Sequence, residues 1–274
     1  MARRDFAGKM VLITGAAGGL GSALCHRFAC QGARIAAMDL GGDRLDALVA
    51  ALPPDSLAIA GDIADPDACL AAVERTVAHL GALDALINNA GITHRSLLKD
   101  TDPNVIRRVM EVNFFGAMQL THAALPHLIA SRGMVAAVSS VAGYAPLLGR
   151  TGYAASKHAL HGFFDTLRTE LEDAGVDVTL ICPSFIATGI GGAALGGKGV
   201  PATSARITTG GESDPDDIAR RIVDAMAAGR HLLLPDRTSR LAWWVSRFAP
   251  GTYARIMKHR TSAEFQPTHE EIRS

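Results

Sequence analysis

The chain has 274 residues, of which 48% are hydrophobic and 20% are charged, enough apolar material to bury the core of one large globular domain. Its 27 basic residues balance its 27 acidic residues, which argues against a protein whose overall charge attracts nucleic acid or an anionic surface. The absence of a run of about eighteen apolar residues excludes a membrane-spanning helix, and no signal-peptide pattern follows the basic N-terminus. We therefore expect a cytoplasmic protein with four reduced cysteines.

Short apolar runs alternate with segments of helical periodicity along most of the chain. Strands are predicted at residues 9–14, 34–39, 57–60, 83–88, 134–139, 176–182 and 231–234. Helices are predicted between them, at residues 20–31, 44–52, 65–80, 103–130, 152–173 and 216–228. This alternation calls for a parallel sheet with helices on both faces. The sequence therefore predicts one doubly wound α/β domain with seven parallel strands over residues 1–237, followed by an extension over residues 238–274.

A glycine-rich turn joins the first predicted strand to the first helix. Its sequence is Thr14-Gly15-Ala16-Ala17-Gly18-Gly19-Leu20-Gly21. Glycines permit a tight turn and a close approach of the backbone, and the following helix N-terminus attracts a pyrophosphate. A purely structural turn is the alternative, but the position at the first strand–helix junction favours dinucleotide binding. The expected contacts are Gly15, Ala17, Gly18, Gly19, Leu20 and Gly21.

Acidic residues at the ends of the next two strands bear on the choice of nucleotide. Asp39, eighteen residues after Gly21, could accept hydrogen bonds from the adenine ribose and would repel a 2′-phosphate; a strand-end cap is the alternative. Arg44, the nearest downstream basic residue, is interpreted as solvated helix surface. NAD is therefore favoured over NADP. Asp62 and Ile63 could contact the adenine, although Asp62 could equally be a loop cap.

Tyr153 and Lys157 stand four residues apart on a predicted helix, and Ser140 lies thirteen residues before Tyr153. Residues at this spacing share one helix face about 5–6 Å apart. An ammonium group beside a phenol lowers the pKa of the phenol, which is otherwise about 10 and too high for acid–base work at neutral pH. A hydroxyl at Ser140 could hold a substrate oxygen against the phenol. In isolation each residue has a plain structural interpretation, so the prediction depends on a hydride carrier bound nearby.

The glycine turn, Asn88-Asn89-Ala90-Gly91, Ser140 and Tyr153-x-x-x-Lys157 together resemble the short-chain dehydrogenase/reductase family over residues 7–235. The resemblance implies a Rossmann-type fold and reversible hydride transfer between a nicotinamide and a carbinol carbon. It implies that Asn89, Ala90 and Gly91 stabilise the sheet beside the cofactor. It further implies that Tyr153 exchanges the hydroxyl proton, that Lys157 binds the nicotinamide ribose, and that Ser140 orients the substrate oxygen.

Two further segments match the family pattern. Asn113 matches a fourth catalytic position, whose backbone carbonyl would hold a water linking Lys157 to solvent; an amide bonded to neighbouring backbone is the plain alternative. Residues 183–188 resemble the family's Pro-Gly-x-x-x-Thr segment, with Ser184 in place of the usual glycine. The resemblance implies cofactor contacts from Pro183, Ile186 and Thr188.

The loops at the carboxyl ends of the strands are expected to form the substrate pocket. Candidate wall residues are His94, Arg95 and the segments 141–148 and 190–207, whose apolar character favours a lipophilic alcohol or ketone over a sugar or hydroxy acid. The glycine-rich stretch 189–211 is expected to act as a mobile lid. His94 and His122 lack companions at ligand spacing, so no metal is expected.

The C-terminal extension contains both tryptophans of the chain in two basic, amphipathic segments, 240–248 and 253–260. Three interpretations remain open: packing over the pocket or a neighbouring subunit, peripheral attachment to a membrane, and a loose tail. The long helices at 103–130 and 152–173 carry the surfaces through which the family usually assembles. We therefore expect a homo-oligomer, a tetramer or a dimer.

The leading hypothesis is an NAD-dependent dehydrogenase acting on a secondary alcohol of steroid-like or retinoid-like character. An NADPH-dependent carbonyl or oxoacyl reductase is the first alternative, against which Asp39 argues. A non-catalytic nucleotide-sensing or scaffolding protein is the second, and the complete set of Ser140, Tyr153 and Lys157 argues against it.

Overall fold

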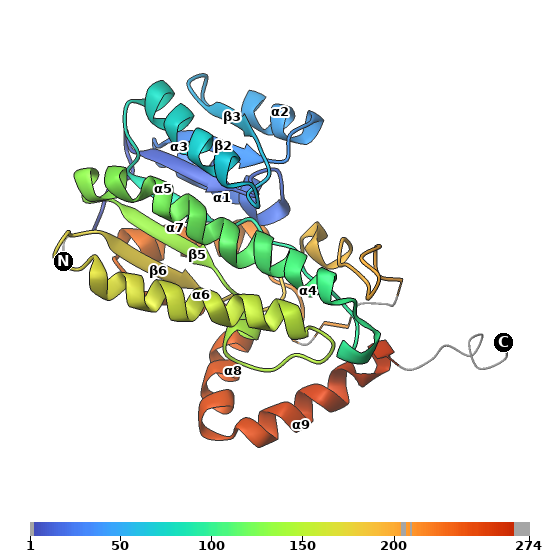
Figure 1. Cartoon of the computed structure of the whole chain (residues 1–274). Helices are drawn as coiled ribbons and strands as arrows, with labels where there is room; N and C mark the ends of the chain where they lie inside the picture. The colour runs from blue at the N-terminus through green and yellow to red at the C-terminus, as the bar shows by residue number, and fades with distance from the viewer. Residues whose placement is uncertain (1–2, 204–206, 209, 266–274) are drawn as a thin grey trace.

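The strands form a seven-stranded parallel sheet in the order β3-β2-β1-β4-β5-β6-β7 (Figure 1). The computed structural model describes residues 3–203, 207–208 and 210–265. The strands are β1 (Met10–Thr14), β2 (Arg34–Asp39), β3 (Leu57–Ala60), β4 (Ala85–Asn88), β5 (Met134–Val138), β6 (Asp177–Ile181) and β7 (Leu232–Leu233). The strand order reverses direction between β1 and β4, so the predicted doubly wound fold is confirmed. Such a reversal opens a crevice at the carboxyl ends of the strands.

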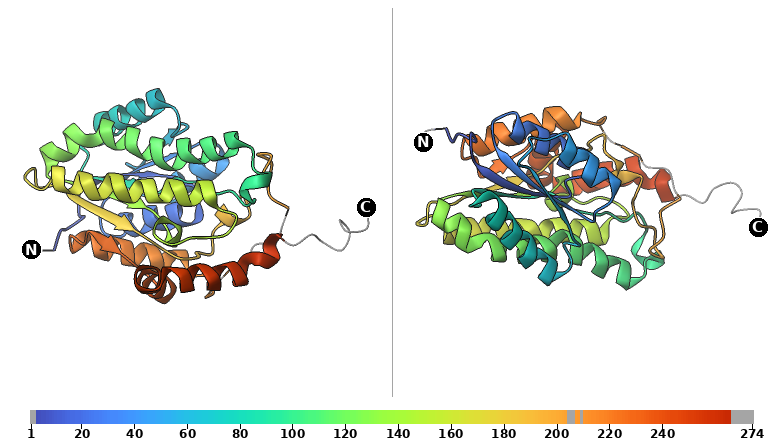
Figure 2. Two further views of the ribbon diagram at one scale, coloured as in Figure 1. Left: turned by 60° about the horizontal axis from the view of Figure 1, so that its bottom comes forward. Right: turned by 90° about the horizontal axis from the view of Figure 1, so that it is seen from above.

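Helices cover both faces of the sheet (Figure 2). They are α1 (Gly19–Ala29), α2 (Asp43–Ala50), α3 (Pro66–Leu80), α4 (Pro103–Met110), α5 (Gly116–Ser131), α6 (Thr151–Glu170) and α7 (Pro215–Ala227). One buried cluster joins the sheet to α1, α2 and α7, and a second joins it to α3, α5 and α6. Burial on both faces explains why the strands read as continuous apolar runs rather than as alternating patterns.

Three helices begin with the same dipeptide, an aspartate at the N-cap followed by proline. The carboxylates of Asp65, Asp102 and Asp214 accept hydrogen bonds from backbone N–H groups in the first turns of α3, α4 and α7, at 3.0, 2.8 and 3.2 Å. Proline fits the first helical position because its missing N–H would have no partner within the helix. The predicted start of the third helix at Asp65-Pro66 is therefore confirmed.

The predicted helix over residues 103–130 is divided by a single π-helical turn, Glu111–Phe115, between α4 and α5. The N–H of Gly116 donates to the carbonyl of Glu111, five residues earlier. Gly116 also packs against Ile63, where an added Cβ would lie 2.8 Å from the side chain. Asn113 lies within this turn.

The extension forms two helices, α8 (Arg237–Phe248) and α9 (Pro250–Thr261), which lie beneath α6 in Figure 1. A capping box starts α8: Asp236 accepts from the N–H of Ser239, and the Ser239 hydroxyl accepts from the N–H of Asp236. Ala242 of α8 and Tyr253 and Met257 of α9 form a buried cluster with Ala145. The division of the chain at residue 237 stays a prediction. No helix among the described residues is long and apolar enough to cross a bilayer.

Candidate active site

A cavity of about 820 Å³ lies where the strands end, between the glycine turn, α6 and the C-terminal helices. Ser140, Tyr153 and Lys157 line it, whereas Asn113 lies one layer behind. Every predicted cofactor residue also lines it, namely Gly15, Ala17, Gly18, Gly19, Leu20, Gly21, Asp39, Asp62, Ile63, Asn89, Ala90, Gly91, Pro183, Ile186 and Thr188. The fold thus gathers residues that are up to 173 positions apart in the sequence around one space.

The glycine turn is tied to the end of β4. The Thr14 hydroxyl accepts from the N–H groups of Asn89 and Ala90 at 3.1 and 3.0 Å, and the Asn89 amide donates to the Thr14 carbonyl at 2.9 Å. Gly15 has a φ of 63°, and an added Cβ would lie 2.8 Å from the Ala90 Cα. At Gly21 an added Cβ would collide with the Gly15 carbonyl. The turn therefore presents bare backbone to the cavity, which suits the close approach of a pyrophosphate.

Asp39 and Arg44 lie together at one end of the cavity. One Asp39 oxygen accepts from the N–H of Ala17 and the other from the N–H of Leu40, both at 2.8 Å, so the carboxylate does cap the strand end. Arg44 is exposed, but its guanidinium donates to the Ala17 carbonyl at 2.7 Å and lines the cavity. Arg44 is therefore exposed helix surface, as interpreted, but it also reaches from the first turn of α2 to the glycine turn.

Asp62 also serves as a loop cap while lining the cavity. Its carboxylate accepts from the N–H of Ala64 at 3.0 Å and from Arg108 at 2.8 Å. Burial opposes ionisation, but these two donors outweigh it and hold the pKa of Asp62 below its ordinary value. Asp62 is therefore an anion at neutral pH.

Lys157 is buried beside the Tyr153 ring. Its side chain is 4% exposed, its Nζ lies 5.7 Å from the ring centre, and it donates to the Val138 carbonyl at 2.8 Å. Burial lowers the pKa of Lys157 to about 8, although Cys182 opposes this shift. At neutral pH this ammonium is mostly charged and adjacent to the phenol, as the four-residue spacing predicts.

Asn113 holds the loop after β4 against α6. Its amide nitrogen donates to the Ile92 carbonyl and to the Ser156 hydroxyl, both at 2.9 Å, while its oxygen accepts from the Ile92 N–H at 2.8 Å. An added Cβ at Gly91 would lie 3.3 Å from this oxygen and 3.5 Å from Lys157 Nζ. The Asn113 side chain therefore bonds to neighbouring backbone, as the plain structural interpretation predicts, and it does so from the π-turn between α4 and α5.

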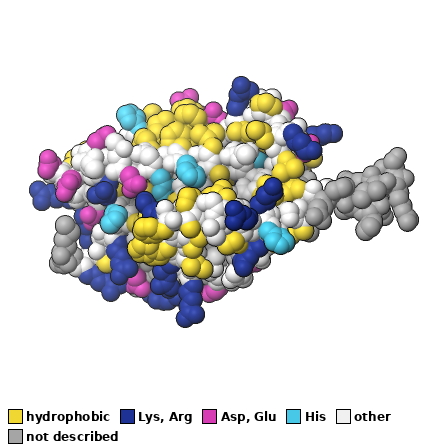
Figure 3. Space-filling model, turned by 90° about the horizontal axis from the view of Figure 1, so that it is seen from below, with side chains coloured by type: hydrophobic (Ala, Val, Ile, Leu, Met, Phe, Trp, Pro, Cys, Tyr) yellow, Lys and Arg dark blue, Asp and Glu magenta, His cyan; other side chains and the backbone are white. Residues whose placement is uncertain are grey.

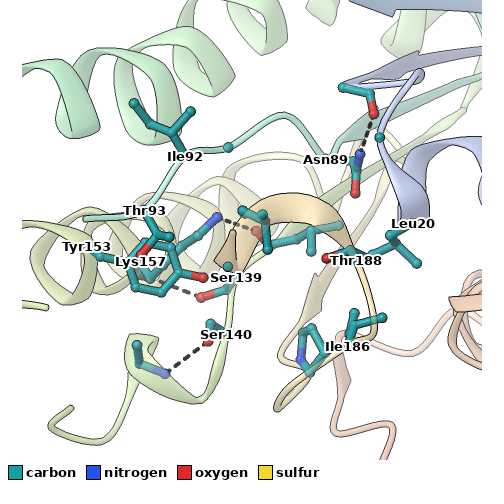
Figure 4. Close-up of a pocket in the computed structure, with 18 of the residues that line it drawn as sticks. Leu20, Asn89, Ile92, Thr93, Ser139, Ser140, Tyr153, Lys157, Ile186 and Thr188 are labelled. Atoms are coloured by element: carbon teal, nitrogen blue, oxygen red, sulfur yellow. Dashed lines mark hydrogen bonds between the residues drawn. The ribbon is translucent and has the colours of Figure 1, made fainter. Parts of the chain in front are cut away.

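Ser139 and Ser140 are turned in different directions (Figure 4). The Ser140 hydroxyl accepts from the N–H of Ala142 at 3.2 Å at the cavity wall. The Ser139 hydroxyl is buried, donates to the Lys157 carbonyl at 3.2 Å and lies 3.1 Å from His161 Nε2. Ser139 therefore serves the packing of α6, and Ser140 has the hydroxyl next to the open space.

The segment after β6 closes the cavity opposite α6. The Thr188 N–H donates to the Ile186 carbonyl at 2.8 Å, and the Thr188 side chain lies against Gly19, where an added Cβ would be 2.9 Å away. The N–H of Ser184 donates to Asp236 at 3.0 Å. This bond links the segment to the start of α8, and Ser184 lines the cavity.

His94 was expected to line the pocket, and this expectation is wrong. The ring is fully buried, accepts from the N–H of Gly152 at 2.9 Å, and lies 3.3 Å from the Ser96 hydroxyl. Burial, helped by the charge of Arg150, lowers the pKa of His94 to about 4, so the ring is neutral. It fixes the start of α6 from behind, whereas Arg95 does line the cavity.

The expected wall segments contribute only some of their residues. From 141–148 these are Val141, Ala142 and Leu147, and from 190–207 they are Ile190, Gly191, Ala193 and Ala194; residues 204–206 lie outside the described residues. The extension adds wall residues that sequence reasoning missed, namely Thr238, Leu241, Ala242, Val245, Tyr253, Ile256, Met257 and Arg260. The amphipathic pattern of the extension is the sequence signal that could have identified these wall residues. Packing over the pocket, the first of the three interpretations, is what the structure shows.

The chain is similar to known oxidoreductases over nearly its whole length. The family model described as short chain dehydrogenase matches residues 9–195. A Bos taurus protein named dehydrogenase/reductase SDR family member 7B is 36% identical over 95% of this chain and 83% of its own length. An Arabidopsis thaliana protein named 11-beta-hydroxysteroid dehydrogenase-like 2 is 36% identical over 66% of this chain and 60% of its own.

Solved structures show the same fold. A short chain dehydrogenase/reductase from Burkholderia phymatum, crystallised with NAD, superposes with a TM-score of 0.80 at 23% identity, covering 97% of this chain and 99% of that one. Since the family model covers most of the chain and the Bos taurus relative matches 95% of it at 36% identity, the chain belongs to the short-chain dehydrogenase/reductase family.

Proposed function

We propose that this oxidoreductase interconverts a secondary alcohol and a ketone, with NAD as the preferred cofactor. The observation that carries the proposal is the buried Lys157 ammonium beside the Tyr153 ring, in the wall of the cavity that the glycine turn also lines. The bound nicotinamide supplies or accepts the hydride. Gly15, Gly18, Gly19 and Gly21 would hold its pyrophosphate, and Asp39 its adenine ribose.

The remaining chemistry belongs to side chains of the chain. Tyr153 takes the proton from the substrate hydroxyl, or returns it to the carbonyl oxygen. Lys157 favours the ionised phenol because its positive charge is held in a site with little water. Ser140 donates to the substrate oxygen and stabilises its developing charge. Asn113 keeps the loop after β4 and α6 at a fixed separation.

Turnover of secondary alcohols tests the proposal. We expect the purified protein to reduce NAD⁺ in the presence of a lipophilic secondary alcohol, with sterols and retinoids included in the screen. A protein that binds NADH but oxidises no alcohol and reduces no ketone would instead be a nucleotide sensor.

The choice of cofactor depends on Asp39 and Arg44. The carboxylate supports NAD, as does the Burkholderia protein crystallised with it. The Arg44 guanidinium, bonded to the Ala17 carbonyl, is the specific observation in favour of the alternative, an NADPH-dependent reductase, because it could pair with a 2′-phosphate. We expect wild type to have the higher kcat/KM with NAD⁺, and Asp39→Ala to shift this preference toward NADP⁺ by at least about tenfold. A wild-type preference for NADP⁺ would reverse the assignment.

We further propose that the substrate is lipophilic. Apolar side chains from α8 and α9, among them Leu241, Val245, Ile256 and Met257, form part of the wall. The Arabidopsis relatives carry names of hydroxysteroid dehydrogenases, which agrees with a large apolar substrate. The same helices also lie at the molecular surface.

The exposed face of α8 suits an anionic membrane. Leu241, Trp244 and Phe248 are 66%, 60% and 76% exposed, and the last two rings stack 5.5 Å apart. Residues 237–261 contain six Lys and Arg residues and no Asp or Glu, so the balanced charge of the chain conceals a basic surface. Figure 3 shows hydrophobic side chains among basic ones on this side of the molecule. Apolar residues edged by cations are typical of interfacial helices.

We propose that this face binds anionic lipid and admits substrate from the bilayer. We expect wild type to float with vesicles containing phosphatidylserine and not with neutral ones. Replacing Leu241, Trp244 and Phe248 by serine should abolish flotation, whereas Leu98→Ser, also at an exposed leucine, should not. Unchanged flotation of the triple variant would contradict lipid binding by this face. Conversion of the variant from dimer to monomer in sedimentation would show that the face contacts another subunit instead.

We also propose a homo-oligomer, a tetramer or a dimer, assembled through α4, α5 and α6. Phe115 and Ile129 are 37% and 42% exposed on this side of the fold, while Phe164 belongs to the core. Sedimentation velocity would test the assembly, and replacing Phe115 and Ile129 by glutamate should weaken it. A monomeric wild type would contradict it.

A further inference from the structure

Arg95 is a buried arginine in the cavity wall, and its side chain has no polar partner within residues 3–203, 207–208 and 210–265. It is 6% exposed, and no hydrogen bond or ion pair joins its guanidinium to the residues that the structure describes. Its Nε is fully buried without a hydrogen-bond acceptor. A buried charge without a partner is among the most costly features of a folded protein.

The backbone holds Arg95 in this place. Its N–H donates to the Leu195 carbonyl at 2.7 Å, and the preceding residue, His94, is fixed against the start of α6. The backbone of Arg95 is therefore tied to the end of the segment that contributes Ala193 and Ala194 to the wall, and its side chain lines the same cavity.

Two other arginines of the wall are neutralised within the protein, whereas Arg44 and Arg260 are exposed to solvent. Arg150 pairs with Glu264 at 2.7 Å, and Arg108 pairs with Asp62 at 2.8 Å. The acidic residues of the wall are Asp39 and Asp62, which lie at the ends of β2 and β3, on the nucleotide side. Among the described residues no carboxylate of the wall therefore faces Arg95, while the nearby His94 is neutral.

We propose that Arg95 binds an anionic group of the substrate, in the simplest case a carboxylate. A guanidinium donates two parallel hydrogen bonds to a carboxylate, and the pair is strongest where water is excluded. Resting on the proposed function, this makes the substrate a lipophilic hydroxy or oxo acid, with its alcohol carbon at Tyr153 and its acid at Arg95. It revises the sequence-based preference for a neutral lipophilic alcohol over a hydroxy acid.

Binding of a matched pair of probes tests the proposal without turnover. We expect wild type to bind octanoate at least about tenfold more tightly than octanamide in isothermal titration calorimetry, as suits a charge-assisted pair. Arg95→Met should bring the two affinities within about twofold, and Arg95→Lys should keep part of the difference. Arg168→Met, at an exposed arginine on α6, should bind like wild type.

Stability supplies a second measurement. If Arg95 awaits a ligand, Arg95→Met should melt at least about 2 °C above wild type in the absence of acids, because a costly unpaired charge is removed. A purely structural arginine would give a lower melting temperature. Equal affinity of wild type for the two probes, or a retained preference in Arg95→Met, would overturn the proposal.

A separate measurement tests the proposed oxidoreductase function independently of the role of Arg95. Oxidation of 2-octanol with NAD⁺ reports hydride transfer on a substrate that has no acid group. Turnover of 2-octanol without any preference for octanoate would leave the oxidoreductase assignment and sink the role of Arg95. Preference for octanoate in a protein that oxidises no alcohol would support the role of Arg95 and contradict the oxidoreductase assignment.

Discussion

The ammonium of Lys157 is buried at a position where a neutral side chain would have a lower free-energy cost of desolvation. It is 4% exposed, and burial, opposed in part by Cys182, lowers its pKa to about 8. Such a charge is retained where it acts on a neighbour, here the Tyr153 phenol at the cavity wall. The cost of the charge should be measurable as a dependence of stability on pH.

A comparison of wild type with Lys157→Met across pH isolates this cost. The pKa of Lys157 falls from 10.5 in the unfolded chain to about 8 in the fold, so between these values the unfolded chain binds more protons. The free energy of unfolding of wild type should therefore rise by about 3 kcal/mol relative to Lys157→Met between pH 8 and 10.5. Below pH 8 the difference should be constant and favour the variant. Urea unfolding at intervals of pH would check this; parallel curves would place the lysine in contact with solvent.

The two neighbouring serines offer a matched pair of substitutions. Ser140→Ala removes the hydroxyl at the cavity wall, so we expect kcat to fall at least about a hundredfold, as for loss of a donor to a developing oxyanion. Ser139→Ala removes a hydroxyl that bonds the Lys157 carbonyl, so kcat should fall less than about tenfold, with some loss of stability. Steady-state kinetics on both variants would measure these losses. A larger loss of kcat in Ser139→Ala than in Ser140→Ala would assign the catalytic hydroxyl to Ser139.

The candidate acid–base residues were predictable from sequence because Tyr153 and Lys157 are neighbours on a single helix, where spacing alone sets contact. Arg95 was also predicted to line the pocket, but the bonding partners of Arg44 and Arg95 could not be predicted. Whether an arginine is paired depends on which carboxylates the fold brings near it, and these come from distant segments. The charge of Arg150, for example, is matched by Glu264, more than one hundred residues later.

At the scale of elements, the start of α6 is held from two sides. His94 accepts from the Gly152 N–H, and Arg150, at the N-cap, pairs with Glu264 from the last described turn of the chain. Glu264 also accepts from the N–H of Ile207. These contacts connect the extension and the segment after β6 to the helix that carries Tyr153.

Glu264→Gln should therefore destabilise the whole fold. The Arg150 side chain is 9% exposed, and the substitution removes the negative charge that pairs with it, so we expect about 3 kcal/mol less stability in chemical denaturation. Glu170→Gln, at the exposed end of α6, should change stability by less than about 0.5 kcal/mol. A neutral result at Glu264 would mean that water or another group already serves Arg150.

Periodicity located every strand and most helices, since buried parallel strands and amphipathic helices repeat differently along the chain. It could not show the π-turn at Glu111–Phe115, because one extra residue leaves the apolar pattern of the two flanking helices nearly unchanged. The end of α6 at Glu170 rather than residue 173 shows the usual limit on helix boundaries.

At the scale of the whole molecule, one cavity is shared between two parts of the chain. The strand ends build the side where we propose that the nucleotide binds, and α8 and α9 line another part of the wall. The sequence of the extension fits three interpretations, because an amphipathic helix does not reveal which surface its apolar face contacts. Contacts of Ala242, Tyr253 and Met257 with Ala145 show how the inner face is used.

Loosening this cover should affect the substrate more than the cofactor. In the double variant Tyr253→Ala/Met257→Ala we expect the KM for lipophilic alcohols to rise at least about fivefold, because two apolar side chains leave the wall. The Kd for NADH should change less than about twofold. Leu70→Ala, at an exposed position on α3, is the control for both constants. A larger change in NADH affinity than in KM would place the nucleotide under the extension.

The most direct test of the account is the substitution Tyr153→Phe, measured for turnover and for cofactor binding in the same preparation. We predict that kcat falls at least about a hundredfold, since a positioned acid–base group is lost, while the Kd for NADH stays within about threefold. Turnover close to that of wild type would show that the phenol does not carry the proton.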